Sequence, residues 1–185
     1  MKVFLEIGCA DFDTLLPLAE KGGWCGHCVE PVPKHAATLR ERAASLPVAI
    51  HELAISDRNS NIRMVVGGAG DDGWALGASH VIEHDHLGNR MLDHPANKHL
   101  RQEEIEVQAM RLDCFLDDNG IDRIDFMKID VEGHELNILE NYNWSVKPAV
   151  IKIEHKHLPG NRLDEVLKNA GYTLFIETDD IYAIL

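Results

Sequence analysis

The sequence predicts an α/β domain built on a mostly parallel, doubly wound sheet. Short apolar runs alternate with segments of helical periodicity, which is the pattern of parallel strands joined by crossover helices. Aromatic residues make up only 6% of the chain, while Val, Ile, Leu and Ala are plentiful, and this composition favours an α/β fold over an all-β sandwich. The 185 residues are enough for one substantial core, so we expect a single domain over residues 1–185.

The first 54 residues predict the order strand, helix, strand, helix, strand. The expected strands are residues 2–7, 26–30 and 47–54, and the expected helices between them are residues 15–21 and 33–44. Asp13 precedes the first helix as an N-cap residue, and the pair Gly22-Gly23 ends it. Pro33 suits the first position of the second helix, where a backbone N–H has no intrahelical partner. Strands separated by helices in this way are expected to be parallel.

Residues 58–104 are predicted as an irregular insertion that contains one short edge strand at residues 63–66. Long irregular segments in compact domains commonly serve as lids or binding loops, so we expect a substrate lid here. The spacing of His80, His84 and His86 in this insertion invites a zinc site. No cysteine lies nearby in the sequence, however, and lid or surface histidines are the preferred interpretation.

The second half returns to alternating strands and helices. The expected strands are residues 105–109, 124–129 and 149–153, and the expected helices are residues 113–119, a segment after VEGHE, and residues 163–170. The last helix is indicated by Leu163, Val166, Leu167 and Ala170, which share one helical face. The final residues, YTLFIETDDIYAIL, predict an antiparallel hairpin.

The chain carries a formal net charge of −13 and has a pI near 5.2. An acidic surface repels nucleic-acid phosphates and anionic lipids, so we expect neither nucleic acid nor a membrane as a partner. No apolar run approaches the roughly 18 residues needed to cross a bilayer, the N-terminus does not read as a signal peptide, and the four cysteines are too few for a disulfide framework. We therefore expect a cytoplasmic protein with reduced thiols. Its oligomeric state is left open, with a homodimer as one option.

The segment WCGHC, residues 24–28, spells the active-site signature of protein disulfide isomerases. In such oxidoreductases the first cysteine lies at a helix N-terminus, where the helix dipole lowers its pKa. Here the motif follows a predicted helix end and turn, and the residues after it, VEPVP, read as a strand end and a loop. A thiol–disulfide oxidoreductase is therefore a disfavoured alternative, and the motif is predicted to enter a strand.

In a doubly wound sheet, ligands bind beyond the carboxyl ends of the strands, where the strand order reverses. Gly8 follows the first strand, and Glu30 ends the second, where an acid can accept hydrogen bonds from both hydroxyls of a ribose. A dinucleotide needs the pattern G-x-G-x-x-G for its pyrophosphate, but this turn has one glycine, and Asp11 and Asp13 would repel phosphate. S-adenosylmethionine carries a sulfonium and an ammonium group and no phosphate, so the turn favours this methyl donor over a dinucleotide.

The chain resembles the FkbM family of S-adenosylmethionine-dependent methyltransferases in six segments, which in order are IGCADFDT, VEPVP, HELAISD, LDCFL, IDFMKIDVEGHELNILEN and VIKIEH. The resemblance covers about residues 4–156, and its most specific element is KIDVEGHE, which matches the family pattern K-x-D-V-E-G-x-E. It implies a Rossmann-like class I methyltransferase domain with S-adenosylmethionine as cofactor. It also implies an enzyme that methylates a hydroxyl group of a sugar or another small molecule.

The resemblance and the strand ends together give the candidate cofactor-binding residues, which are Glu6, Gly8, Cys9, Ala10, Asp11, Glu30, Pro31, Ala54, Ile55, Ser56 and Asp57. The turn after the first strand would line the methionine and ribose part, Glu30 would hold the ribose hydroxyls, and residues 54–57 would flank the adenine. Phe12 stands where the family has its second glycine, and the N-terminal helix common in this class does not precede the first strand. A catalytically inactive cofactor-binding or interaction module is therefore an alternative function.

The candidate catalytic residues lie at or just after the end of the apolar strand at residues 124–129. They are Lys128, Asp130, Glu132 and His134. Methyl transfer requires the enzyme to position the acceptor and to remove its proton, and Asp130 or His134 is the candidate general base. Alternatively, Asp130 and Glu154 bind a divalent metal such as Mg²⁺ that lowers the pKa of the acceptor hydroxyl. Structural roles are open for Glu132, near a helix N-terminus, and for Lys128, as the ion-pair partner of an acid.

Overall fold

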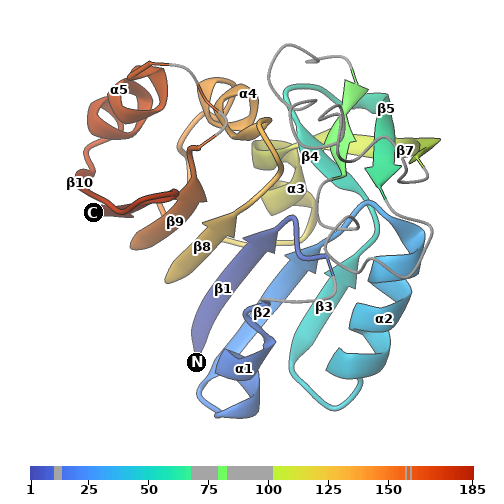
Figure 1. Cartoon of the computed structure of the whole chain (residues 1–185). Coiled ribbons are helices and arrows are strands. Elements are labelled where there is room, and N and C mark those ends of the chain that lie inside the picture. The colour runs from blue at the N-terminus through green and yellow to red at the C-terminus, as the bar shows by residue number, and fades with distance from the viewer. Residues whose placement is uncertain (11–13, 68–78, 83–101, 157, 159) are drawn as a thin grey trace.

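The computed structural model describes residues 1–10, 14–67, 79–82, 102–156, 158 and 160–185 of the chain. These residues form a large sheet with helices packed on it and a smaller second sheet (Figure 1). In Figure 1 the second sheet lies beyond the ends to which the arrows of β1, β2 and β3 point. The carboxyl ends of the large sheet therefore face the second sheet.

Among the described residues, the large sheet has seven strands in the order β10-β11-β9-β8-β1-β2-β3. Their bounds are β1 Lys2–Ile7, β2 Trp24–Val29, β3 Val48–His51, β8 Phe126–Ile129, β9 Val150–Glu154, β10 Thr173–Ile176 and β11 Asp180–Ile184. The pairs β1–β2, β2–β3, β1–β8 and β8–β9 are parallel, whereas β11 is antiparallel to both β9 and β10. The predicted parallel sheet with a C-terminal antiparallel hairpin is confirmed.

The strand order reverses between β1 and β8. From β1 the chain builds outward through β2 to β3, and it returns to place β8 and β9 on the other side of β1. Backbone hydrogen bonds join the strand ends at this point, because the N–H of Asp130 donates to the carbonyl of Ile7 at 3.0 Å, and the N–H of Gly8 donates to the carbonyl of Val29 at 3.0 Å. Such a switch point is where this type of sheet binds its ligands.

Helices cover both faces of the large sheet, and their bounds are α1 Leu16–Glu20, α2 Pro33–Ala43, α3 Leu112–Asp118, α4 Glu135–Glu140 and α5 Arg162–Asn169. Side chains of β1 alternate between two cores. Phe4 packs in the cluster that contains Leu16 of α1 and Leu39 of α2, whereas Leu5 packs in the cluster that contains Phe115 of α3. None of the helices in the described part of the chain is long and apolar enough to cross a membrane.

The second sheet, in the order β4-β7-β5-β6, corrects two sequence predictions. Its strands are β4 Ala54–Ser56, β5 Ser60–Gly67, β6 His80–Val81 and β7 Gln102–Arg111. The single strand predicted at residues 47–54 is wrong, because β3 ends at His51 and β4 pairs with β7 in the other sheet. The edge strand predicted at residues 63–66 is longer and lies between β7 and β6, where it buries Ile62 and Met64.

The insertion predicted at residues 58–104 is therefore not irregular throughout, since β5, β6 and the start of β7 fall within it. Residues 68–78 and 83–101 lie outside the described residues, and the proposed lid role falls on them. The division of the chain into one domain over residues 1–185 stays a prediction.

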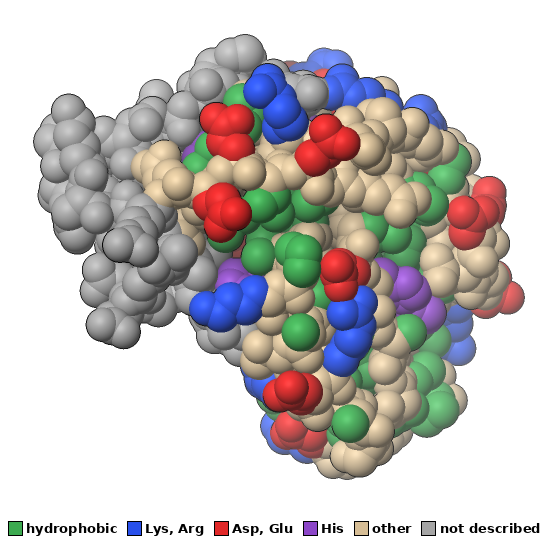
Figure 2. All heavy atoms as spheres, turned by 90° about the vertical axis from the view of Figure 1, so that its right-hand side faces the viewer, with side chains coloured by type: hydrophobic (Ala, Val, Ile, Leu, Met, Phe, Trp, Pro, Cys, Tyr) green, Lys and Arg blue, Asp and Glu red, His purple; other side chains and the backbone are tan. Residues whose placement is uncertain are grey.

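The face that carries α2 and β3 has a mixed charge. Figure 2 shows Lys and Arg side chains interspersed with Asp and Glu side chains on this face. One exposed pair joins Arg40 of α2 to Glu52 after β3, at 2.7 Å between Nη1 and Oε2. Exposed pairs of this kind contribute less than about 1 kcal/mol to stability, so the packing of α2 depends on its buried residues instead.

Candidate functional site

A cavity of about 220 Å³ lies at the carboxyl ends of β1, β2, β8 and β9. Its walls come from the turn after β1, the ends of β2 and β8, the start of β4, and the second sheet. Most of the predicted site residues line it, namely Gly8, Cys9, Ala10, Glu30, Pro31, Ala54, Ile55, Lys128, Asp130, Glu132, His134 and Glu154. The fold thus brings candidate residues from both halves of the chain into one site.

Three predicted cofactor residues do not line the cavity. Glu6 is fully buried on β1, and Ser56 and Asp57 reach the site only through a neighbour, as described below. Asp11 lies outside the described residues. So does Phe12, the residue that stands where the family has its second glycine.

The turn after β1 requires glycine at position 8. Gly8 has φ = +79°, and a Cβ built on it would lie 1.8 Å from the carbonyl oxygen of Asp130. No side chain fits at this position. Because glycine has none, the end of β1 can approach the end of β8 closely. Ala10, two residues on, also has a positive φ of 44°. Left-handed backbone at a non-glycine residue costs about 1 kcal/mol or more and is concentrated at functional sites.

The carboxylate of Glu30 holds this turn in place. Its Oε2 accepts hydrogen bonds from the backbone N–H groups of Cys9 at 3.2 Å and Ala10 at 2.8 Å, and its Oε1 accepts one from Val32 at 2.8 Å. His35 of α2 lies nearby, with Nδ1 at 3.8 Å from Oε1. Since an ionised carboxylate has about four acceptor positions, Glu30 has little capacity left for other donors while all these contacts persist.

Glu6 and Lys128 form a buried pair beside the cavity. Glu6 is 0% exposed, and its Oε1 lies 3.5 Å from Nζ of Lys128. Burial raises the pKa of Glu6 to about 7, although the charge of Lys128 and a hydrogen bond from the N–H of Leu15 both lower it. Lys128 also lies 3.9 Å from Oδ2 of Asp130. The acid partner expected for Lys128 is thus not one residue but two, Glu6 and Asp130.

Ser56 connects His134 to Asp57. The Oγ of Ser56 lies 3.0 Å from Nε2 of His134 and donates to Oδ1 of Asp57 at 3.1 Å. A hydroxyl has one proton to donate, so the contact with His134 requires Nε2–H to donate to Ser56. This order assigns the ring proton to Nε2 and makes Nδ1 the basic nitrogen of a His134 ring that is only 3% exposed.

Three carboxylates that line the cavity lie close together. Among the described residues, Asp130, Glu132 and Glu154 each offer an oxygen atom, and these atoms lie within 4.8 Å of one another. Burial raises the pKa of Asp130, against the lowering effect of Lys128, and burial also raises the pKa of Glu154. Lys156 donates a hydrogen bond to Oε1 of Glu154, so the cluster already contains a cation. Glu132 itself has φ = +54°, a second non-glycine residue in left-handed backbone at the cavity.

Glu135 shapes the segment that carries the catalytic candidates. Its Oε1 accepts a hydrogen bond from the N–H of Val131 at 2.9 Å, and its Oε2 accepts one from the N–H of Gly133 at 3.0 Å. The residue is 1% exposed, and burial raises its pKa to about 7. Glu135 therefore fixes the turn between β8 and α4.

Sequence reasoning missed several residues that line the cavity. Lys156 follows the end of β9 by two residues, and this position was a usable signal because strand ends mark the site. His35 lies on the buried face of α2 and reads as a core residue in the sequence. Met64 and Val81 come from the second sheet and Ser79 directly precedes β6, and no local pattern links these residues to the strand ends of the large sheet.

The two other cysteine and histidine motifs lie elsewhere. WCGHCV forms β2, with Cys25 and Cys28 three positions apart on a strand and so on opposite faces. The motif is thus not at a helix N-terminus, which confirms that it enters a strand. His80 is buried in β6, whereas His84 and His86 lie outside the described residues.

The sequence of the chain matches known methyltransferases. The profile of the Methyltransferase FkbM domain matches residues 4–174, a range that contains all six segments quoted above. The 2-O-methyltransferase NoeI of Sinorhizobium fredii is 32% identical over 149 residues, which covers 74% of this chain and 56% of that protein. The chain therefore spans just over half the length of this relative.

Solved structures with similar folds have low identity. The precorrin-6y C5,15-methyltransferase of Geobacter metallireducens is 13% identical with a TM-score of 0.47, and the alignment covers 99% of this chain and 78% of that chain. A SAM dependent methyltransferase of Aquifex aeolicus is 15% identical with a TM-score of 0.43, covering 99% of this chain and 81% of that chain. These scores support no argument about the site, and the fold assignment depends on the strand order described above.

Proposed function

Because the chain belongs to the FkbM family of methyltransferases, we propose that it transfers a methyl group from S-adenosylmethionine to a hydroxyl group of a sugar or another small molecule. The relative NoeI is named a 2-O-methyltransferase, which supports oxygen as the acceptor atom. The observation that carries the proposal is the single cavity that joins the turn after β1, Glu30 and the segment from Asp130 to His134.

The cavity suits S-adenosylmethionine in charge. Glu30, Asp130, Glu132 and Glu154 give its walls more acidic than basic groups. Such walls favour a ligand with sulfonium and ammonium charges and disfavour a pyrophosphate. The residues that would hold the cofactor are Gly8, Cys9, Ala10, Glu30, Pro31, Ala54 and Ile55, with Glu30 at the ribose. When bound, S-adenosylmethionine supplies an activated methyl group on a sulfonium.

The general base in this proposal is His134. A catalytic base is commonly oriented by a second group, and Ser56 with Asp57 supplies that group by fixing the ring proton on Nε2. Nδ1 is buried in this structure, so the acceptor hydroxyl reaches it only after the cavity wall adjusts, and the basic Nδ1 then takes the proton of that hydroxyl. Asp130 is the alternative base, because its raised pKa makes it a better proton acceptor than an ordinary aspartate.

A divalent cation such as Mg²⁺ is a second form of the proposal. Asp130, Glu132 and Glu154 have the oxygen ligands that Mg²⁺ prefers, and a bound cation would lower the pKa of the acceptor hydroxyl. The cation would have to displace Lys156 from Glu154. Methyl-transfer assays after treatment with EDTA, with and without added Mg²⁺, test this form, and unchanged turnover removes it.

The partners and the location of the protein stay predictions from the sequence. A small-molecule or sugar hydroxyl as the acceptor, rather than a nucleic acid or a membrane, agrees with the net charge of −13. A homodimer and a cytoplasmic location rest on the sequence alone.

The activity is tested by incubating the protein with S-adenosylmethionine labelled in its methyl group and a panel of mono- and oligosaccharides. We expect label in one sugar, at an O-methyl group whose position is found by NMR, together with one S-adenosylhomocysteine per methyl group transferred. Label on nitrogen or carbon would contradict O-methylation. Binding of S-adenosylhomocysteine without transfer to any acceptor would instead favour the inactive cofactor-binding module.

A further inference from the structure

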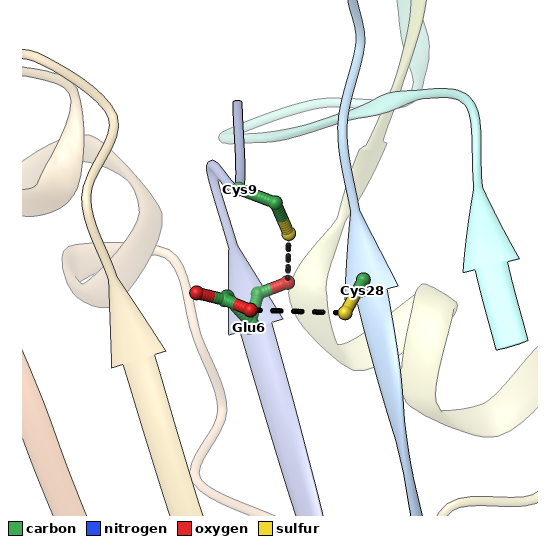
Figure 3. A group of neighbouring side chains, drawn as sticks. All are labelled: Glu6, Cys9 and Cys28. Carbon is green, nitrogen blue, oxygen red and sulfur yellow. Dashed lines mark hydrogen bonds between the residues drawn. The ribbon is translucent and has the colours of Figure 1, made fainter. Parts of the chain in front are cut away.

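Three side chains form a second, fully buried cluster beside the cavity. Glu6 of β1, Cys9 of the following turn and Cys28 of β2 are at most 2% exposed. Figure 3 shows the side chain of Cys9, from the turn after β1, and that of Cys28, from β2, directed toward Glu6. The Sγ of Cys28 lies 3.7 Å from Oε2 of Glu6, and that of Cys9 lies 3.6 Å from the Glu6 carbonyl oxygen. The methyl-transfer proposal uses neither thiol as a reacting group.

We propose that Glu6, Cys9 and Cys28 bind a Zn²⁺ ion. Among the described residues, the carboxylate oxygen and the two sulfur atoms all lie within 4.8 Å of one another. A tetrahedral Zn²⁺ site with Zn–S of about 2.3 Å and Zn–O of about 2.1 Å places sulfur and oxygen about 3.6 Å apart. The separation of 3.7 Å between Sγ of Cys28 and Oε2 of Glu6 matches this spacing.

The chemistry of the ligands selects zinc over the hard cations. Thiolates are soft ligands and bind Zn²⁺ much better than Mg²⁺ or Ca²⁺, which require oxygen. Oε2 of Glu6 also accepts a hydrogen bond from the N–H of Leu15, but a carboxylate oxygen has a second lone pair for a metal. This site is therefore distinct in kind from the all-oxygen cluster of Asp130, Glu132 and Glu154.

The local charges balance when the ion is present. Two thiolates and one carboxylate carry three negative charges, and Zn²⁺ reduces the total to one. The ammonium group of Lys128, 3.5 Å from Oε1 of Glu6, offsets the charge that remains. Burial raises the pKa of the Cys9 thiol well above its usual value, so this thiol must give up its proton when it binds the ion.

The proposed site adjoins the cavity at one ligand. Cys9 lines the cavity, whereas Glu6 and Cys28 do not. Three protein ligands leave a fourth position for a water molecule, as in zinc sites that are not closed. A bound ion would link the turn after β1 to β2, and Glu30 already links the same two segments through its hydrogen bonds to Cys9 and Ala10.

The proposal is tested with Cd²⁺ alone, because Cd²⁺ replaces Zn²⁺ at thiolate sites and gives an ultraviolet charge-transfer band. Protein freed of metal with EDTA and kept reduced should show this band, saturating at one equivalent. The apparent affinity should rise with pH, because the thiolate form binds the ion and thiol protons leave as it binds. A missing band, or affinity that does not change with pH, would overturn the site.

Serine variants of the four cysteines give matched controls. Cys9→Ser and Cys28→Ser should each lose the band, whereas Cys25→Ser and Cys114→Ser should keep it, since those residues lie outside the cluster. The reverse result, or loss in all four variants, would contradict the assignment. The band does not depend on methyl transfer, so its absence would leave the proposed function untouched.

The wild-type protein provides a test that needs no variant to fold. The X-ray absorption spectrum of the one-equivalent zinc protein should show two sulfur neighbours at about 2.3 Å. The chain has 11 histidines that can capture zinc at its surface. A first shell of nitrogen and oxygen without sulfur would show that surface capture is the only binding, and a disulfide between Cys9 and Cys28 would equally overturn the site.

Discussion

The carboxylate of Glu30 accepts a 2.8 Å hydrogen bond from the backbone N–H of Ala10, which joins the end of β2 to the turn after β1. The same oxygen accepts from Cys9 at 3.2 Å, so one buried acid organises the turn that the proposed cofactor would contact. An acid at the end of the second strand therefore has two possible tasks in this chain, to shape the turn and to hold a ribose.

Replacing Glu30 with alanine separates the turn from β2. Three backbone N–H groups lose their acceptor, and unsatisfied buried donors should lower the free energy of unfolding by about 1–3 kcal/mol. We also expect the affinity for S-adenosylhomocysteine to fall at least about 10-fold, or about 1.4 kcal/mol. Glu52→Ala is the control, because Glu52 forms an exposed pair with Arg40 and its loss should change stability by less than about 1 kcal/mol. Equal effects of the two substitutions in urea unfolding and calorimetry would contradict the role of Glu30.

Gly8→Ala should be strongly destabilising because of contact as well as conformation. The new Cβ would lie 1.8 Å from the carbonyl oxygen of Asp130, so β1 and β8 must separate. Gly22 has nearly the same φ, +82° against +79°, but no atom lies within 4 Å of its built Cβ. Gly22→Ala should therefore cost only the backbone term of about 1–2 kcal/mol, and Gly8→Ala at least about 2 kcal/mol more. Similar unfolding midpoints for the two variants would show that the close approach is not required.

Measuring kcat in variants of His134 and Asp130 shows which of the two residues is the general base. If His134 is the base, His134→Gln should lower kcat at least about 100-fold, the size typical of general-base catalysis, with cofactor affinity little changed. Ser56→Ala should lower kcat about 10-fold and change its pH profile, because the ring proton is no longer fixed on Nε2. Asp130→Asn should then have the smaller effect on kcat. A larger loss in Asp130→Asn, with His134→Gln still active, would assign the base to Asp130.

Stability should fall in acid because of a histidine pair on the large sheet. Nδ1 of His27 on β2 lies 3.0 Å from Nε2 of His51 on β3, and the ring of His51 packs edge-on against Phe115. Burial, with a smaller effect of His27, lowers the pKa of His51 from 6.5 to about 4. The unfolded chain therefore binds this proton first, so the stability due to neutral His51 is present above pH 6.5 and is lost as the pH falls toward 4.

Urea unfolding at pH 7 and pH 5 measures this effect. The wild type should lose about 1 kcal/mol more than His51→Gln between the two pH values, a figure reduced for the partial exposure of the ring. Glu6 and Glu135, whose folded pKa values are raised to about 7, shift stability in the opposite direction, but they are present in both proteins and cancel. An equal loss in both proteins would show that His51 does not carry the pH dependence.

Local sequence signals predicted the large sheet well. The bounds of β1 are those expected, residues 2–7, because an apolar run that meets a glycine is a strong local signal. The prediction for residues 47–54 was wrong because the change of sheet between β3 and β4 depends on pairing with β7, more than 50 residues later. Alternation of residue types cannot reveal which sheet a strand joins.

The site was predicted at the level of strand ends and not of contacts. Gly8, Glu30 and Asp130 were predicted to lie together because the carboxyl ends of parallel strands meet at one edge, and they line one cavity. Ser56 was expected near an adenine, but its hydroxyl contacts His134, 78 positions along the chain. Contacts between side chains so far apart depend on the packing of the two sheets, which a single sequence does not show.

The central claim is that the cavity beside Glu30 binds the methyl donor, and calorimetric titration of the purified protein with S-adenosylhomocysteine and S-adenosylmethionine tests it most directly. We predict one site per chain, a Kd of about 1–100 μM, corresponding to roughly −8 to −5.5 kcal/mol, and at least about 10-fold weaker binding in Glu30→Ala. Absence of binding by both ligands to the folded wild-type protein, or affinity unchanged in Glu30→Ala, would contradict the account.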